Sequence, residues 1–537
     1  MTAATPSDRS GVLRSVGVVA GLTTISRFLG FGRDILLAGL FGTSAAMSAF
    51  AVAYRIPNLF RALFGEGALS AAFIPVFVES RQREGDVAAW RLARSVFTLV
   101  GGALLILVIA GVVAAGFVLA GDGLSPTARL TWSLLRIMLP YLLFICLAAV
   151  SMGALNAFHH FAVPAATPWI LNVVQIAVML FVCPRVGSTP EQQIFAVAWG
   201  VLVAGVLQWA AQVPMLWRMG ADLRPGIDVH DPRLARVLLL MGPAALGRAA
   251  SQFNVFFATM LAVSIGEWAA AALYFSERLI YLPQGIFATA LSTVLLPLFS
   301  GHGAQHDLKG MRDAVNHATR IILFVMLPAA VGLFVLAEPI LRMSFEWRNF
   351  GPDSTLLTAR SLRVYCAGLV FFGLGKVVVP AFYGMQDTKT PVRVGLITVL
   401  ANLAMSLTFL WSWPLHYKHA GLAFSVVAAE ALNCLILTRL LEKRLGPPDW
   451  NAIGRSLARD LTGCALLAVT AFFAEAGARE LALHAGLAPK LAQIAGVLAG
   501  LAAGIATYFA SARLMKSPEL TDFITAFRGR RRRTART

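Results

Sequence analysis

The stretch GGALLILVIAGVVAAGFVLA, residues 101–120, decides the fold class, because its twenty consecutive residues carry no charge. A helix of about twenty residues is about 30 Å long, which is the thickness of the hydrocarbon core of a bilayer. Similar apolar runs recur along the chain, and they are continuous rather than alternating. Because backbone groups in lipid must hydrogen-bond internally, these runs predict membrane-spanning helices and an all-α integral membrane protein.

The composition supports this class. Of the 537 residues, 58% are hydrophobic and 13% are charged, and the mean hydropathy is +0.72, which excludes an ordinary soluble protein. The net charge of +18 would suggest nucleic acid for a soluble chain, but here Lys and Arg are expected in cytoplasmic loops. The basic run at residues 528–533 (RGRRRR) fits anionic lipid headgroups. None of the five cysteines forms a CxxC pair, so we expect no metal and no disulfide framework.

The apolar runs predict about fourteen spans. Their approximate centres lie near residues 22, 60, 105, 142, 174, 205, 250, 285, 325, 370, 400, 430, 467 and 500. Basic residues are dense in every second connection, for example between Arg81 and Arg94 and between Arg439 and Arg459. The positive-inside rule places these connections in the cytoplasm. An even number of spans then places both termini there too.

An internal repeat organises the chain. GALSAAFIPVFVES (Gly67–Ser80) is similar to TALSTVLLPLFSGH (Thr289–His302), with Pro75 aligned to Pro297. NAFHHFAVPAATP (residues 156–168) is similarly echoed by PAFYGMQDTKTP (residues 380–391). Because both echoes have nearly the same separation, we expect two six-helix halves of the same orientation, an arrangement that carriers use with a binding site between the halves.

Several arginines lie within these apolar spans, and they are the candidate binding residues. An arginine at the bilayer centre costs about 2.5–3.5 kcal/mol on insertion scales, so it normally faces protein or a water-filled cavity. Gly30, Gly32 and Pro57 predict helix interruptions that would line such a cavity. The neighbouring acids are too few to neutralise every base, and a guanidinium suits a phosphate ligand. The bases are Arg27, Arg33, Arg55, Arg61 and Arg278, and the acids are Asp34, Glu66 and Glu277. The alternative is that Arg33 and Arg61, near helix ends, extend to the membrane interface.

Two stretches of the sequence, one of which contains Arg27 and Arg33, resemble a known family. SRFLGFGRDILLAGLFG (residues 26–42) and KVVVPAFYGMQDTKTPVRVG (residues 376–395) resemble the MurJ (MviN) lipid II flippases. The resemblance implies the fold of the multidrug/oligosaccharidyl-lipid/polysaccharide exporter superfamily, with two six-helix lobes in a V plus two C-terminal helices. The implied organisation is an N-terminal lobe at 11–222, a C-terminal lobe at 233–445, two helices forming a lipid-tail groove at 455–515 and a basic cytoplasmic tail at 516–537.

The resemblance also implies a function. The chain would flip lipid II, an undecaprenyl-pyrophosphate-linked glycopeptide, across the bacterial inner membrane during peptidoglycan synthesis, and cell-wall enzymes and membrane lipids would be its partners. Arg27, Arg33, Arg61 and Arg278 match the family's required cavity arginines. From their place in the same spans, and not from the resemblance, Asp34, Arg55, Glu66 and Glu277 are expected to support or gate this site.

The sequence departs from the family in two places. Many relatives have an Asp where this chain has Ser48, which puts any role of that acid in doubt. Some relatives bind sodium through acids in the seventh and eleventh spans. The corresponding runs here contain no acid, and the seventh adds Arg248. Our hypothesis is that Arg248 replaces the cation with a fixed charge.

Three other functions stay open at this point. A flippase for another polyprenyl-linked oligosaccharide would use the same cationic site. A cation-coupled drug antiporter should show acids in its cavity instead. A membrane enzyme would need a catalytic cluster, and none is apparent, since the adjacent His159 and His160 are better explained as a helix end. We therefore expect no enzyme activity, no cofactor and no nucleic-acid partner.

Overall fold

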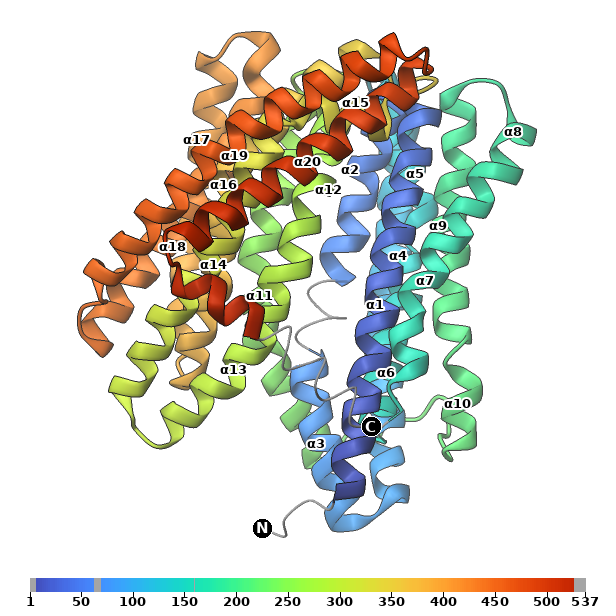
Figure 1. The fold of residues 1–537 in the computed structure, drawn as a ribbon. Helices are drawn as coiled ribbons and strands as arrows, with labels where there is room; N and C mark the ends of the chain where they lie inside the picture. Colours follow the sequence, from blue (N-terminus) through green and yellow to red (C-terminus); the bar gives the residue numbers. More distant parts are fainter. Residues whose placement is uncertain (1–5, 62–68, 159, 526–537) are drawn as a thin grey trace. The chain divides into compact units, whose positions relative to one another are not determined.

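The computed structural model describes residues 6–61, 69–158 and 160–525, with side chains at all of these positions except 6–20, 22–24, 69–71, 242–251, 289–290 and 293. The structure is 86% helical, and its described residues contain no strand (Figure 1). The predicted all-α class is therefore confirmed. The chain divides into two compact units, Met1–Ala271 and Ala272–Thr537, and the division falls inside one helix.

The first unit contains eleven labelled helices in its described part. They are α1 (Pro6–Phe41), α2 (Ala45–Phe60), α3 (Leu69–Glu84), α4 (Asp86–Ala120), α5 (Pro126–Met138), α6 (Tyr141–Ala157), α7 (Ala162–Ala177), α8 (Cys183–Val186), α9 (Pro190–Ala210), α10 (Val213–Arg218) and α11 (Pro232–Ala262). A π-helical segment, Val178–Val182, joins α7 to α8. Helix α11 packs against α2, α3 and α4.

Helix α12 (Ala269–Pro283) crosses into the second unit. The helices that follow are α13 (Thr289–Ala304), α14 (Leu308–Val335), α15 (Ala337–Phe345), α16 (Pro352–Gly384), α17 (Lys389–Ser412), α18 (Leu415–Leu445), α19 (Trp450–His484) and α20 (Pro489–Leu514). A π-helical segment, Gln284–Ala288, joins α12 to α13. Helix α16 packs against α13, α14 and α18, and this places it at the centre of the unit.

Ten helical stretches in the described part are long and apolar enough to span a membrane. Each of the fourteen predicted centres falls within a helical segment. The ten stretches establish a multi-pass arrangement, and the number fourteen stays a prediction. The most apolar stretch is Asp86–Ala120, which contains the run of residues 101–120.

One predicted feature is wrong. Gly30 and Gly32 do not interrupt the first span, because α1 continues without a break from Pro6 to Phe41. A glycine in a helix costs about 1 kcal/mol relative to alanine, which is too little to break a helix of 36 residues. Pro57 also lies inside a continuous helix, α2. Gly65 and Gly67, which flank Glu66 in the sequence, lie outside the described residues.

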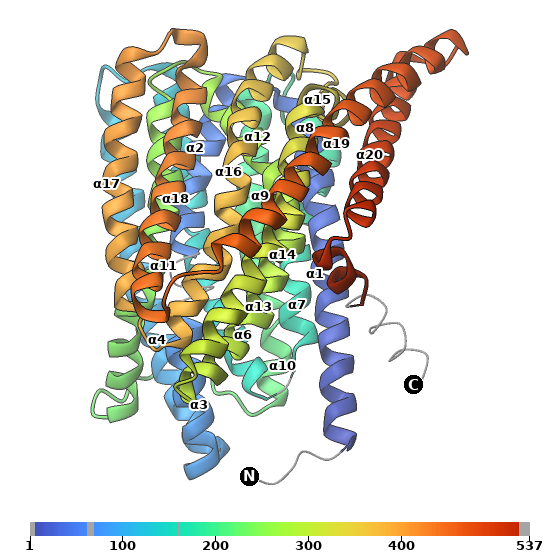
Figure 2. The same cartoon turned by 60° about the vertical axis from the view of Figure 1, so that its left-hand side comes forward.

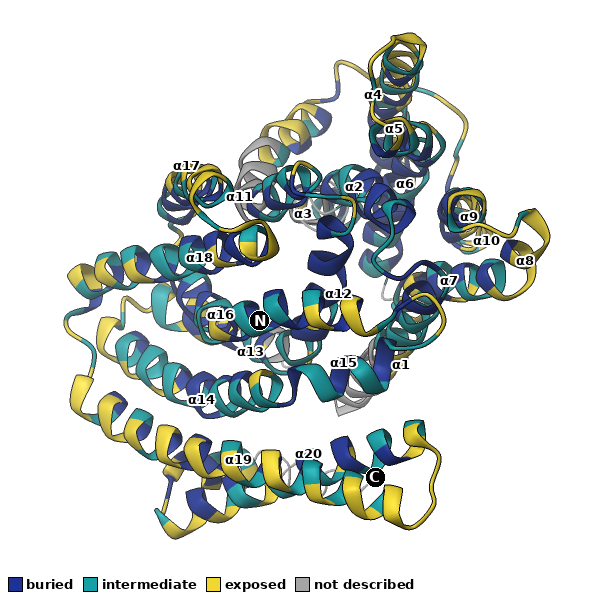
Figure 3. Cartoon of the chain, turned by 90° about the horizontal axis from the view of Figure 1, so that it is seen from above, coloured by how far each residue is buried: buried dark blue, intermediate teal, exposed yellow. Residues whose placement is uncertain are grey.

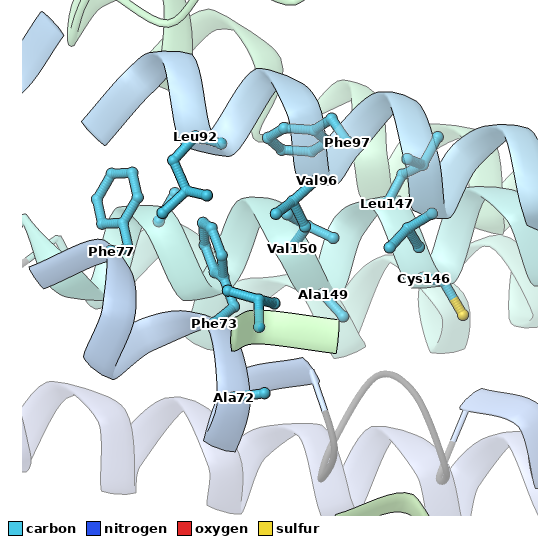
Figure 4. Close-up of a cluster of buried hydrophobic side chains, with 14 of the residues drawn as sticks. Ala72, Phe73, Phe77, Leu92, Val96, Phe97, Cys146, Leu147, Ala149 and Val150 are labelled. Carbon is cyan, nitrogen blue, oxygen red and sulfur yellow. The ribbon is translucent and has the colours of Figure 1, made fainter. Parts of the chain in front are cut away.

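The core of the first unit is built from α3, α4 and α6 (Figure 4). Phe73 and Phe77 of α3 are fully buried, and they lie against Leu92 and Val96 of α4 and Val150 of α6. The rings of Phe73 and Phe77 are 5.1 Å apart. Because lipid chains are as apolar as these side chains, close van der Waals packing rather than escape from water stabilises such contacts within the membrane.

Helices α19 and α20 form a hairpin that packs on α14 and α15 of the same unit. The two helices run side by side in both views (Figures 1 and 2). Gly496, Gly500 and Gly504 recur every fourth residue along α20. A Cβ atom at Gly496 would lie 2.9 Å from the carbonyl oxygen of Glu475, and one at Gly500 would lie 2.9 Å from that of Ala471. These small residues let the two backbones approach, as in other membrane helix pairs.

Candidate functional site

Arg33 is held between an acid and an amide. Its Nε and Nη2 atoms donate to Oδ1 of Asp34 at 3.1 and 2.8 Å, and its Nη1 donates to Oδ1 of Asn172 in α7 at 3.1 Å. The Asn172 amide in turn donates to the carbonyl of Ser26 at 3.0 Å. The side chains of Arg33 and Asp34 are 12% and 5% exposed. The contact therefore fixes the orientation of this guanidinium and joins α1 to α7.

Arg27 lies six residues before Arg33 on α1 and is half-buried. No hydrogen bond or ion pair joins its guanidinium to any residue that the structure describes. A Cβ atom added at the nearby Gly30 would lie 3.6 Å from the Asn172 side chain, an ordinary contact distance. Burial without such a partner is costly for a guanidinium, so this residue is suited to an anionic ligand.

Arg55 of α2 reaches α11. Its Nε and Nη2 atoms donate to the hydroxyl of Thr259 at 3.2 and 3.1 Å, and that hydroxyl donates to the carbonyl of Val255 at 2.8 Å. Arg61 follows at the end of α2, where its Nε donates to Oδ1 of Asn58 at 3.0 Å. Both arginines are half-buried.

Two of the predicted supporting residues are not described. Glu66 lies outside the described residues, and so does the side chain of Arg248, whose backbone belongs to α11. The hypothesis that Arg248 supplies a fixed charge stays a prediction. The same holds for a supporting role of Glu66.

Ser48 has a structural role that the sequence did not reveal. Its hydroxyl accepts a hydrogen bond from the amide of Ala271 at 3.1 Å, and the side chain is 1% exposed. Ala271 is the third residue of α12, where helix amides have no partner within the helix. A neutral hydroxyl therefore caps α12 at this position.

In the second unit, Glu277 and Arg278 lie on α12. The Arg278 guanidinium stands 4.3 Å from the centre of the Tyr274 ring and 6.0 Å from that of Tyr281, which is cation–π geometry. Glu277 is 4% exposed and accepts a hydrogen bond from the Tyr365 hydroxyl of α16 at 3.4 Å. The Arg278 guanidinium thus contacts the rings of Tyr274 and Tyr281, and the Glu277 carboxylate is hydrogen-bonded to the Tyr365 hydroxyl.

The loop between α16 and α17 contains a second polar cluster. Oδ2 of Asp387 accepts from the Thr390 hydroxyl at 2.5 Å and lies 2.6 Å from Nη2 of Arg444. Burial raises the pKa of Asp387, but the hydrogen bonds from Thr390 and Arg444 outweigh it and lower the pKa to about 2. The carboxylate is therefore ionised at neutral pH and joins this loop to the end of α18. Packing or gating, rather than catalysis, is the role this arrangement suits.

The structure thus brings together Arg33 with Asp34 on α1 and holds Arg55 on α2 and Arg278 on α12. The sequence missed their partners Asn172, Thr259 and Tyr274. The only sign of these partners in the sequence was that each is a polar or aromatic residue within an apolar run. It could not identify the partner, because Arg33 and Asn172 are 139 residues apart.

Comparison with known proteins identifies relatives. A family described as lipid II flippase MurJ matches residues 37–486. A probable lipid II flippase MurJ of Vibrio cholerae is 36% identical over 80% of this chain and 82% of its own. The lipid II flippase MurJ of Burkholderia cenocepacia is 33% identical over 81% of this chain and 84% of its own.

Solved structures agree in fold. A lipid II flippase MurJ in an inward closed conformation, 25% identical, gives a TM-score of 0.74 and covers 92% of this chain and 98% of its own. An inward-facing MATE multidrug resistance transporter gives 0.66 at 14% identity, covering 79% of this chain and 98% of its own. The second likeness shows the fold alone. From the family match and these relatives, the chain belongs to the MurJ family of lipid II flippases.

Proposed function

We propose that this protein moves lipid II from the cytoplasmic to the outer leaflet by alternating access, with Arg27, Arg33, Arg61 and Arg278 binding the pyrophosphate. The family match over residues 37–486 carries the choice of substrate. Half-buried arginines on α1 and α2 and at Arg278 of α12 support the role in binding. Asp34, Arg55 and Glu277 orient these bases in the proposal.

The physical problem is the headgroup. Pyrophosphate and sugars cannot cross hydrocarbon unshielded, because an isolated buried charge is far more costly than any single contact can offset. A guanidinium presents paired N–H donors that match phosphate oxygens. In this proposal the headgroup crosses in a polar space in which these arginines bind it, while its tail stays in lipid along the helices of residues 455–515.

The repeat supports this mechanism. Pro75 lies inside α3 and its aligned partner Pro297 lies inside α13. The second echo falls on the turn from α6 to α7 and on the turn from α16 to α17. Two halves of equal construction can rock against each other around one site.

Translocation of lipid II in proteoliposomes tests the proposal. Arg27→Ala and Arg278→Ala should each reduce flipping by at least about tenfold, since a charge-assisted hydrogen bond contributes about 1.5–3 kcal/mol, while membrane insertion stays normal. Arg83→Ala is the matched control, because that side chain is 76% exposed. Wild-type rates in both Arg27→Ala and Arg278→Ala would exclude the proposed site.

The same assay separates substrates. A proteoliposome loaded with another undecaprenyl-pyrophosphate-linked oligosaccharide should show slower flipping than lipid II. Equal or faster flipping of the other glycan would contradict lipid II as the preferred substrate. It would not contradict the role of the arginines in binding the pyrophosphate.

A further inference from the structure

A cavity of about 240 Å³ lies in the second unit, apart from the proposed substrate residues. It is formed where α15 and the first turns of α16 meet the end of α19 and the start of α20. Figure 3 shows α19 and α20 beside α14 and α15, with exposed residues recurring along both helices of the hairpin. Since one water occupies about 30 Å³ in the liquid, the cavity can admit a phosphate group.

More bases than acids line the cavity. Arg342, Arg363 and Arg479 line it together with only two acids, Glu338 and Glu475. Glu338 serves two of the bases, lying 2.5 Å from Nη2 of Arg342 and 3.7 Å from Nη2 of Arg363. The three arginines come from α15, α16 and α19 in turn. One carboxylate is thus shared by two guanidinium groups, and a further acid, Glu346, lies 4.0 Å from Nε of Arg342.

Two of these arginines have unused donors. The Nε atoms of Arg342 and Arg479 are buried and have no hydrogen-bond partner in the described structure. The acids nearest to Arg479, Glu475 and Glu480, lie 3.9 and 3.8 Å away, too far for a hydrogen bond. A buried donor without a partner destabilises the folded state. An anionic oxygen in the cavity would remove this cost.

The surroundings indicate that the anion belongs to a lipid. Phe472, which lines the cavity, is 55% exposed, and the adjacent Phe473 is 68% exposed. Both lie on α19, which is long and apolar enough to span the membrane, so these rings face the acyl chains. Leu336 and Val497 form an apolar wall of the cavity. A charged cavity beside an exposed apolar face matches a headgroup phosphate joined to acyl chains.

We propose that this cavity binds the phosphate of an anionic membrane phospholipid, with Arg342, Arg363 and Arg479 as its ligands. The bound phosphate joins α19 to α15 and α16, and so fastens the C-terminal hairpin to the rest of its unit. Under the predicted topology, the site lies at the outer end of the hairpin. It does not depend on which substrate the protein flips.

Native mass spectrometry of the full-length protein in detergent tests this site with phosphatidylglycerol as the probe. Arg479→Gln and Arg363→Gln should each raise the dissociation constant for this lipid by roughly tenfold or more, the factor expected for one charge-assisted hydrogen bond. Arg479→Lys should recover part of the affinity, since it keeps the charge without the planar fork. Arg439→Gln is the matched control, because that arginine is 79% exposed on α18.

Two further ligands distinguish the source of the anion. Diacylglycerol of the same chain length, which has no phosphate, should bind at least about tenfold more weakly than phosphatidylglycerol by the same reasoning. Inorganic phosphate at equal concentration should not displace the lipid. Equal binding of diacylglycerol, displacement by free phosphate, or an equal loss in Arg439→Gln and Arg479→Gln would each overturn the proposal.

Discussion

At the scale of single residues, the hydroxyl of Ser48 accepts from the amide of Ala271, and the side chain is 1% exposed. Ser48→Ala would leave that amide without its acceptor in a buried site, which costs about 1–3 kcal/mol. We therefore expect a lower melting temperature in detergent, measured by differential scanning fluorimetry. Ser133→Ala is the control, because the Ser133 hydroxyl only donates to the carbonyl of Arg129 within its own helix. Equal melting temperatures of both variants would contradict the capping role.

A second residue, Asp387, gives a prediction on pH. Its folded-state pKa of about 2 lies below the ordinary value of 3.8. A lowered pKa means that the carboxylate stabilises the fold above pH 4 and that this stabilisation is lost as the pH falls from 4 toward 2. Since the side chain is 18% exposed, we expect Asp387→Asn to cost about 1–2 kcal/mol at pH 7 after allowance for solvent screening.

The measurement is the melting temperature of wild type and Asp387→Asn between pH 7 and pH 3. The difference should shrink as the pH falls from 4 toward 3, because Asp387 then becomes protonated in the unfolded chain while the folded protein keeps it ionised beside Arg444, which favours unfolding. Asp313→Asn serves as the control, since that acid is 61% exposed and lies 3.8 Å from Arg312. A constant difference at all pH values would show that the charge of Asp387 does not matter.

At the scale of elements, the glycines of α20 decide how closely the C-terminal hairpin packs. A Cβ atom at Gly500 would lie 2.9 Å from the carbonyl oxygen of Ala471 in α19, whereas one at Gly477 would meet nothing within 4 Å. Gly500→Ala should therefore destabilise the protein by about 1–3 kcal/mol through overpacking. Gly477→Ala should have no cost or a gain of up to about 1 kcal/mol from helix propensity. Thermal unfolding of the two variants tests the difference.

Elements also show where local sequence is a poor guide. Gly30, Gly32 and Pro57 suggested broken helices, yet α1 and α2 pass through them. Helix propensities and breaker signals are measured in water, where the freed backbone groups have another partner. In a long, packed helix a single glycine costs only about 1 kcal/mol, so the helix persists. The apolar runs predicted the helices correctly, because a backbone in lipid must form its hydrogen bonds internally.

At the scale of the whole molecule, the distribution of charge predicts the topology. Arg439, Lys443 and Arg444 precede α19, and Arg455 and Arg459 begin it, so this connection should be cytoplasmic. Alkaline phosphatase fused after Leu487, in the turn between α19 and α20, should be active in the periplasm. The same enzyme fused after Gly446 should be inactive. Green fluorescent protein at the C-terminus should fluoresce, and the reverse pattern would invert the predicted orientation.

By itself, the sequence determined the membrane class, the repeated pattern, the family and the arginines, because hydrophobic length, spacing and motif letters are local properties of the chain. The tertiary structure decided what each arginine contacts: Asn172 for Arg33, Thr259 for Arg55 and Tyr274 for Arg278. It also decided the role of Ser48 and the convergence of Arg342, Arg363 and Arg479 on one cavity. Most of these contacts join residues that are far apart in sequence, and only the packing of the helices selects which polar side chains meet. Within the membrane, the packing of the helices therefore determines which arginines can offer N–H donors to a ligand.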